Sequence, residues 1–136
     1  MTKYLLDTNI CSYAVKGLYD GVGRRLLLIN PDDIFVSCIT VSEFEYGASR
    51  KNWGERARNT MRAFMSNFDA LPFTESDAIA FGCLRADFER RGLVVGILDL
   101  MIGSQAVNND LILVTHNVKD FAGIPGINIE DWANED

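Results

Sequence analysis

Short runs of consecutive apolar residues alternate along the chain with longer segments in which apolar residues recur every three or four positions. The runs lie at residues 4–6, 34–37, 70–73, 111–114 and 127–129. A short run bounded by turn residues predicts a buried strand, whereas the wider spacing predicts a helix. The pattern therefore predicts strands and helices in alternation.

Helical spacing covers most of the chain between these runs. We expect helices over residues 10–18, 20–29, 41–49, 53–68, 75–91 and 99–109. Two of them begin with the pattern of a capping box, in which a threonine is followed three residues later by an acid: Thr40 with Glu43, and Thr74 with Asp77. Gly92 is expected to end the helix that Thr74 starts.

The alternation defines a fold class. Parallel strands need a crossover connection, which a helix supplies, so 136 residues with this pattern predict one α/β domain with a parallel sheet between helices. We place the domain at residues 1–129 and interpret residues 130–136, with four acids and no base, as an acidic C-terminal tail. In such sheets, ligands bind at the carboxyl ends of the strands, near the point where strand order reverses.

Composition narrows the class of protein. Apolar residues make up 48% and charged residues 24%, which is typical of a folded globular domain. The net charge of −6 argues against a nucleic-acid partner at first sight, but outside residues 130–136 only 15 acids face 13 bases. Cys11, Cys38 and Cys83 are far apart in apolar surroundings, so we interpret them as small core residues. We find no signal peptide and no membrane-spanning stretch, and expect a cytoplasmic protein.

Acidic residues follow the predicted strands. Asp7 ends the first strand, Glu43 opens the helix after the second, and Asp99 opens a late helix inside an apolar segment. Taken singly, each has an ordinary explanation as a cap or a first-turn acid. Taken together, partly buried acids raise one another's pKa unless a cation offsets their charge. Carboxylate oxygens suit Mg²⁺ or Mn²⁺ better than zinc, and such a cation supports phosphodiester cleavage.

The same acids lie in four segments with the sequences LLDTN (5–9), SEFEYGA (42–48), LDLMIG (98–103) and LVTHNVKDF (113–121). In order, spacing and total length, these segments resemble the four motifs of PIN-domain ribonucleases. The likeness is strongest to the VapC-type toxins of bacterial type II toxin–antitoxin pairs. It spans essentially the whole chain.

The resemblance implies a five-stranded parallel sheet flanked by helices in an α/β/α sandwich, and an endoribonuclease that depends on Mg²⁺ or Mn²⁺. By motif match, Asp7 and Asp99 would be the main metal ligands, with Glu43 completing the acidic pocket directly or through water. Thr8 and Thr115 would orient ligands or water. The resemblance further implies a homodimer and a VapB-type antitoxin that blocks the site.

The fourth motif departs from the commonest pattern, because Asn117 stands where many relatives have an acid. Its carbonyl oxygen can still coordinate, and Asp120 lies one helical turn further on, so the choice between them stays open. His116 has no second His and no Ser or Cys partner at motif spacing, and we leave it out of the mechanism. Glu45, two residues beyond Glu43, is expected to point away and to pair or be solvated.

Basic and apolar residues in the middle of the chain have less definite assignments. Ten of the thirteen bases lie between Arg24 and Arg91, mostly on expected solvated helix faces, and some could meet an RNA backbone. Four apolar residues are interpreted either as plain core or as a contact for a second copy or an antitoxin helix: Phe44, Phe64, Met65 and Phe68.

The main hypothesis is an endoribonuclease toxin that cuts RNA, tRNA included, to block translation and arrest growth. One alternative is a catalytically inactive PIN-like domain that only binds a partner, for which Asn117 is the best support. Another is a phospho-acceptor signalling domain, which also has a Mg²⁺-binding acid pocket. Such a domain needs paired acids after the first strand and a central acceptor Asp, whereas Asp7 stands alone.

Overall fold

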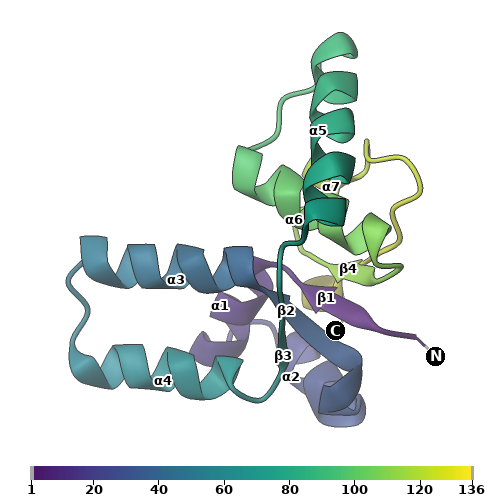
Figure 1. The fold of residues 1–136 in the computed structure, drawn as a ribbon. Coiled ribbons are helices and arrows are strands. Elements are labelled where there is room, and N and C mark those ends of the chain that lie inside the picture. Colours follow the sequence, from purple (N-terminus) through teal and green to yellow (C-terminus); the bar gives the residue numbers. More distant parts are fainter. Residues whose placement is uncertain (1, 136) are drawn as a thin grey trace.

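The computed structural model describes residues 2–135, in which five strands form one sheet with the order β3-β2-β1-β4-β5. Every neighbouring pair of strands is parallel. The strands are β1 (Tyr4–Leu6), β2 (Ile34–Ser37), β3 (Asp69–Leu71), β4 (Ile112–Val114) and β5 (Ile129–Glu130). The predicted α/β class and parallel sheet are confirmed (Figure 1).

Helices connect the strands and cover both faces of the sheet. They are α1 (Thr8–Lys16), α2 (Asp20–Leu28), α3 (Cys38–Arg50), α4 (Glu55–Met65), α5 (Glu75–Arg90), α6 (Ile97–Asn108) and α7 (Val118–Phe121), with short 3-10 helices η1 (Pro31–Asp33) and η2 (Trp132–Asn134). Figure 1 shows α3 and α4 side by side as a hairpin that extends from the sheet, while α5 projects in another direction. No helix within residues 2–135 has the length and apolar character needed to cross a membrane.

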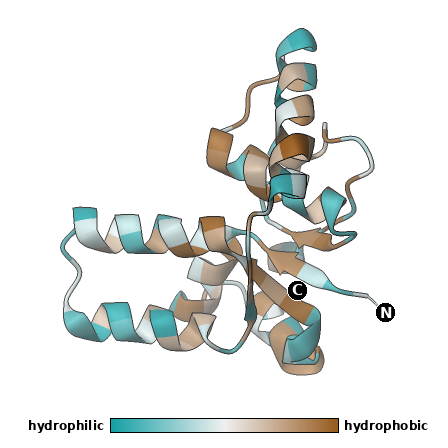
Figure 2. Ribbon diagram, viewed as in Figure 1, coloured by the Kyte–Doolittle hydropathy of each residue, from teal (hydrophilic) through white to brown (hydrophobic). Residues whose placement is uncertain are grey.

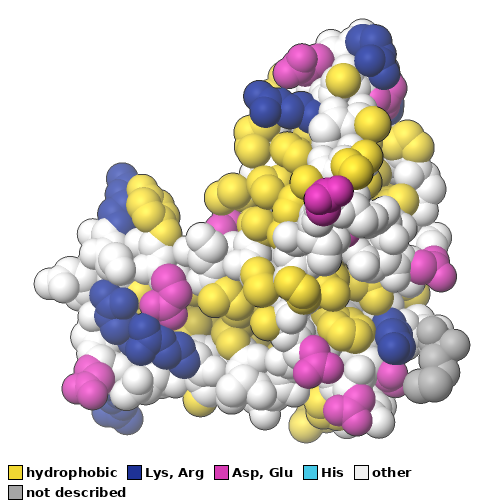
Figure 3. Space-filling model, in the orientation of Figure 1, with side chains coloured by type: hydrophobic (Ala, Val, Ile, Leu, Met, Phe, Trp, Pro, Cys, Tyr) yellow, Lys and Arg dark blue, Asp and Glu magenta, His cyan; other side chains and the backbone are white. Residues whose placement is uncertain are grey.

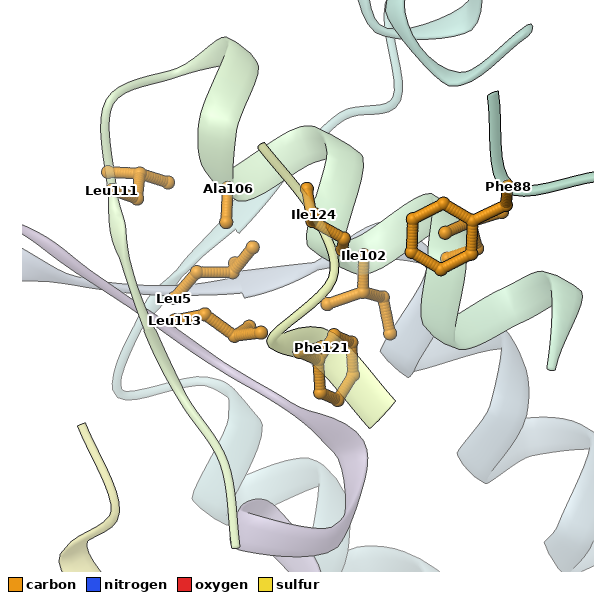
Figure 4. Close-up of a cluster of buried hydrophobic side chains, with 9 residues drawn as sticks. Leu5, Phe88, Ile102, Ala106, Leu111, Leu113, Phe121 and Ile124 are labelled. Atoms are coloured by element: carbon orange, nitrogen blue, oxygen red, sulfur yellow. The ribbon is translucent and has the colours of Figure 1, made fainter. Parts of the chain in front are cut away.

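Successive residues of the central strands β1, β2 and β4 supply two separate cores, because neighbouring side chains in a strand point to opposite faces. Leu5 and Leu113 enter the core formed with α5, α6 and α7, where Phe121 and Ile124 meet them (Figure 4). Leu6 and Val114 enter the second core, formed with α1, α2 and η2. Figure 2 shows the hydrophobic strands between these layers and hydrophilic residues at the far ends of α4 and α5.

Strand order reverses at β1. After β1 the chain adds β2 and β3 on one side, and later β4 and β5 on the other. The carboxyl ends of β1 and β4 are therefore neighbours, and the Asp7 backbone N–H donates to the Val114 carbonyl at 3.0 Å between them. This is the position at which parallel sheets bind ligands.

The helix after β2 starts earlier than the sequence pattern predicts. α3 begins at Cys38, and its N-cap is Ser37, whose hydroxyl accepts a hydrogen bond from the Ile39 N–H at 3.0 Å. The predicted capping box of Thr40 and Glu43 is wrong, because the strand runs directly into the helix and its last residue supplies the cap. Glu43 consequently lies in the second turn of α3 rather than at its start.

Of two other local predictions, one is confirmed and one is wrong in part. The capping box of Thr74 and Asp77 at the start of α5 is confirmed. The prediction that all three cysteines are core residues is wrong for two of them: Cys11 is buried, whereas Cys38 and Cys83 are exposed.

The C-terminal residues pack on the domain instead of forming a separate tail. Glu130 is the last residue of β5, and the Trp132 side chain is completely buried. The Trp132 indole N–H donates to Glu130 Oε1 at 2.9 Å, and the Arg25 guanidinium pairs with Glu130 and lies 5.3 Å from the indole centroid. A Cβ at Gly21 would meet the Trp132 carbonyl at 2.3 Å, so α2 and η2 approach as closely as a glycine allows.

Trp132 gives a stability prediction. Because its indole fills the second core, Trp132→Ala should lower the free energy of unfolding by about 3–5 kcal/mol, measured by urea denaturation. Asn134→Ala, at an exposed residue of the same 3-10 helix, is the matched control. Equal stability of the two variants would show that residues 130–135 do not contribute to the core.

Candidate active site

Asp7 is fixed at the carboxyl end of β1 as the N-cap of α1. Its Oδ1 accepts a hydrogen bond from the Ile10 N–H at 2.8 Å, and the side chain of Thr115, the residue after β4, lies near enough to the same carboxylate to oppose the rise of its pKa. Only 3% of Asp7 is exposed. The ordinary explanation of Asp7 as a cap therefore holds, and the residue also lies at the switch point of the sheet.

Two threonines connect Glu43 on α3 to the start of α1. Thr8 Oγ1 donates to Glu43 Oε1 at 2.6 Å and lies 3.0 Å from Thr40 Oγ1. Since a hydroxyl has one proton, which Thr8 gives to the carboxylate, Thr40 must donate to Thr8. This contact of Thr40 was not predicted from the sequence, although the place of Thr40 one helical turn before Glu43 was an available signal.

Asp99 lies half-buried in the first turn of α6, with Asp120 of α7 nearby. Burial raises the pKa of Asp99, and the negative charge of Asp120 raises it further. The Asn117 side-chain amide donates to the Asp120 carboxylate. The two candidates for the fourth position thus bind each other, and Asp120 is the one whose charge acts on Asp99.

Burial, with a smaller contribution from like charges, raises the pKa of every acid in this cluster. Burial is the main cause that raises the pKa of Asp7 to about 6, and the charges of Asp99 and Glu43 add to it against the hydrogen bonds that lower it. Burial likewise raises the pKa of Glu43, opposed by the hydrogen bond from Thr8 and reinforced by Asp99. We refer to Asp7, Glu43 and Asp99 as the carboxylate site.

The carboxylate site offers only oxygen donors and negative charge, which suits a hard divalent cation. Within residues 2–135, no three His, Cys, Asp or Glu side chains stand close enough to hold a metal ion together as they lie. Mg²⁺ usually takes one or two carboxylates and keeps several waters. Asp7 and Asp99 as ligands, with Glu43 acting through water, fit that mode of binding.

His116 and Glu45 lie outside this cluster and have partners of their own. The Nδ1 atom of His116 is 3.0 Å from Asp131 Oδ2. Glu45 pairs with Arg62 of α4 through hydrogen bonds of 3.0 and 2.8 Å, which confirms the expectation that it pairs rather than joins Glu43.

An apolar groove begins beside the carboxylate site and runs between α1, α3 and α4. Its volume is about 460 Å³, and Thr8 and Glu43 form part of its wall. Phe44, Trp53 and Met61 contribute apolar lining. We refer to this hollow as the α1–α3–α4 groove.

The middle-region apolar residues and bases have structural partners. Phe44, Phe64, Met65 and Phe68 pack against the second core, as the plain interpretation expected. Arg58 donates to the Ala48 carbonyl at 3.0 Å and so braces the α3–α4 hairpin. On the face shown in Figure 3, Lys and Arg side chains lie on that hairpin and near the far end of α5, with hydrophobic side chains gathered between.

Comparison with known proteins agrees with this geometry. The PIN domain family profile matches residues 4–126. The chain is 35% identical to ribonuclease VapC2 of Rickettsia felis over 95% of its length and 97% of that protein. It is 37% identical to the tRNA(fMet)-specific endonuclease VapC of Salmonella typhimurium over 97% and 99%. The fold matches DNA-bound VapBC from Salmonella typhimurium with a TM-score of 0.89 at 37% identity, over 97% of this chain and 99% of that one.

The buried charge of Asp7 gives a second stability prediction. Asp7→Asn keeps a good helix cap and removes the charge. Because the pKa of Asp7 is raised from 3.8 to about 6 in the fold, ionisation destabilises the fold as pH rises through this interval, and the cost is constant above it. In metal-free solution at pH 7, the variant should be more stable than wild type by about 1–3 kcal/mol.

Urea unfolding at several pH values in the presence of a chelator measures this difference, which should vanish below about pH 4. The control is Asp32→Asn, at an exposed carboxylate of η1. An Asp7→Asn variant that is less stable than wild type at pH 7 would contradict the buried-charge assignment.

Proposed function

Since the chain belongs to the PIN-domain family, among the VapC ribonucleases, we propose that it is an endoribonuclease that requires Mg²⁺ or Mn²⁺ and hydrolyses phosphodiester bonds in RNA. The observation that carries this proposal is the carboxylate site, at the switch point of the sheet, with its pKa values raised by burial and mutual repulsion. Relatives named as ribonucleases over nearly the whole chain support it. The phospho-acceptor alternative is not favoured.

The carboxylates would bind the cation, with Asp7 and Asp99 as direct ligands and Glu43 bound directly or through water. Mg²⁺ or Mn²⁺, when bound, supplies a water of lowered pKa and stabilises negative charge on a phosphoryl oxygen. The hydroxyl of Thr8 orients the carboxylate of Glu43, the Ile10 N–H orients Asp7, and Thr115 would support Asp7 from the end of β4. These contacts keep two of the three acids in place before substrate arrives.

Asp120, which accepts a hydrogen bond from the neutral amide of Asn117, extends the negative edge beyond Asp99. Their mutual hydrogen bond leaves the second Asp120 oxygen available, so Asp120 rather than Asn117 is the better candidate for the fourth acid. Its negative charge, which already acts on Asp99, would be offset by the same cation.

We further propose that the enzyme acts as the toxin of a toxin–antitoxin pair in the cytoplasm, blocking translation by cutting RNA and so arresting growth. The relative from Salmonella typhimurium is named for its action on tRNA(fMet). For the present chain, tRNA is therefore the first substrate class to test.

A VapB-type antitoxin is the proposed partner, with the toxin as a homodimer in the complex. The solved neighbours from Rickettsia felis and Salmonella typhimurium are VapBC structures. The α1–α3–α4 groove supports such a partner, because it joins apolar residues to the wall that contains Thr8 and Glu43. Lys16 and Lys51 also line it, so an apolar segment with acidic neighbours would fit.

Asp99→Asn tests the nuclease proposal. Losing a metal-binding oxygen should reduce RNA cleavage by more than about 100-fold and abolish growth arrest. The readout is sequencing of RNA ends after induction, together with cleavage by purified protein in Mn²⁺ or in chelator. Asp32→Asn serves as the control and should cut like wild type.

Cleavage that persists in Asp99→Asn or in chelator would overturn the proposal. The remaining alternative is a catalytically inactive binding domain, and calorimetric titration of the wild-type protein with Mg²⁺ and Mn²⁺ tests it. Absence of heat with both ions would favour this alternative over the nuclease.

Ala57→Glu tests the antitoxin proposal. Ala57 is exposed and lines the α1–α3–α4 groove, so a bound antitoxin would bury the added carboxylate, which should weaken antitoxin binding by more than about 10-fold while RNA cleavage persists. Growth arrest should then return in cells that make both proteins. Ala63→Glu, at an exposed residue of the same helix outside this groove, is the matched control. Equal antitoxin affinity of the two variants would place the partner elsewhere.

A further inference from the structure

Three aromatic rings from distant segments meet beside the carboxylate site. Tyr13 lies on α1, Tyr19 precedes α2, and His116 follows β4. Their ring centroids are separated by 4.9 Å (Tyr13 to Tyr19), 5.1 Å (Tyr19 to His116) and 6.3 Å (Tyr13 to His116). Tyr19 is 43% exposed, and 38% of the His116 side chain is exposed. We refer to these three side chains as the aromatic platform.

Backbone and charge connect the platform to the carboxylate site. Tyr13 is on the helix that Asp7 caps, and His116 lies two residues after Val114, whose carbonyl accepts the Asp7 N–H. The negative charge of Asp7 is among the causes that raise the pKa of Tyr13, after burial and Tyr19. A polynucleotide cut at Asp7 would therefore have a neighbouring nucleotide close to these rings.

The backbone at Tyr19 is unusual for a tyrosine. Only residues 17–19 join α1 to α2, and both Gly17 (φ 68°) and Tyr19 (φ 58°) adopt a positive φ. Glycine adopts this conformation readily and asparagine more easily than other residues, whereas a large side chain is strained there. Tyr19 also provides no side-chain cap for α2. Strain held at one bulky residue beside a candidate active site indicates that the ring itself is needed.

His116 is held rigidly in the platform. A carboxylate can only accept, so Nδ1 carries the proton that is shared with Asp131. Asp131 is fixed in turn, because its Oδ1 accepts the Ala133 N–H at 3.1 Å. Side chains ordered before binding lose little entropy when a ligand stacks on them.

We propose that the aromatic platform stacks an unpaired base of the RNA, next to the phosphate that is cut. The proposal rests on the proposed ribonuclease function and adds a subsite to it. Every base has a π-face, so stacking tolerates any sequence but requires the base to be free of a helix. The platform would consequently favour loops and single strands over paired RNA.

Two substitutions separate stacking from structure. Tyr19→Gly removes the ring and relieves the strained backbone, whereas Tyr19→Phe keeps the ring. Both are made in the Asp99→Asn background, so that RNA is not cut during binding. The probes are a fluorescent oligoadenylate and an abasic ribose-phosphate oligomer of equal length, which carries the same phosphates without bases; affinity is measured by fluorescence anisotropy.

The Tyr19→Gly protein should bind oligoadenylate about 5- to 50-fold more weakly, because stacking on one aromatic residue accounts for a factor of this size. Its affinity for the abasic oligomer should stay within about twofold, since phosphate contacts are untouched. Tyr19→Phe should match the parent with both probes. The melting temperatures of both variants are measured as well, because Tyr19→Gly relieves the positive φ but loses the ring contacts with Tyr13 and His116.

If Tyr19→Gly keeps the parent's preference for oligoadenylate over the abasic oligomer, the platform proposal is wrong. If that preference is kept while the melting temperature falls, the ring serves only in packing. Cleavage by the wild-type chain distinguishes this outcome from failure of the proposed function. If wild type cuts no RNA but its preference for bases depends on Tyr19, the nuclease proposal fails while the platform stands. If wild type cuts RNA and the preference ignores Tyr19, only the platform fails.

Discussion

The geometry of the site depends most on the position of one residue, Asp7, which is buried between the ends of two neighbouring strands. The backbone N–H of Asp7 continues the hydrogen bonding of β1 to β4, and its side chain caps α1. The residue therefore cannot move without disturbing both the sheet and the first helix. Parallel pairing of β1 with β4 also places Thr115 against it, so the register of the sheet determines the geometry of the site.

The buried charge of Asp7 lowers the stability of the free protein but serves the proposed binding of a cation. A carboxylate with a pKa near 6 is an unfavourable charge at neutral pH, and Asp99 and Glu43 add to its cost. The fold tolerates the charge because two cores flank the sheet and because Trp132 closes the second of them beside α2. A bound cation would reverse the sign of the electrostatics, so the feature that destabilises the free protein is also the one that attracts its cofactor.

Much of the fold and of the site follows from local sequence. Strand and helix periods gave the α/β class, and the rule for parallel sheets pointed to the carboxyl end of β1, where Asp7 lies. The assignment of Asp7, Glu43 and Asp99 as metal ligands stays a prediction. Contacts that depend on where a strand ends in space could not be predicted from the local sequence. Ser37 rather than Thr40 caps α3 because the strand leads straight into the helix. The role of Trp132 is visible only once α2 approaches it, since its neighbours Glu130 and Asp131 make the segment look solvent-exposed in sequence.

The distribution of charge explains how a protein with a net charge of −6 could bind RNA. The acids at the C-terminal end are partly compensated by Arg25, and Arg62 is paired with Glu45, so these bases are engaged within the fold. RNA affinity would then come less from bulk attraction to phosphates, which salt screens, than from the cation and from stacking. Stacking on Tyr19 is insensitive to base identity, so it would position a strand without choosing its sequence. Selection among RNAs would thus rest on whether a base is unpaired and how the loop fits the surface.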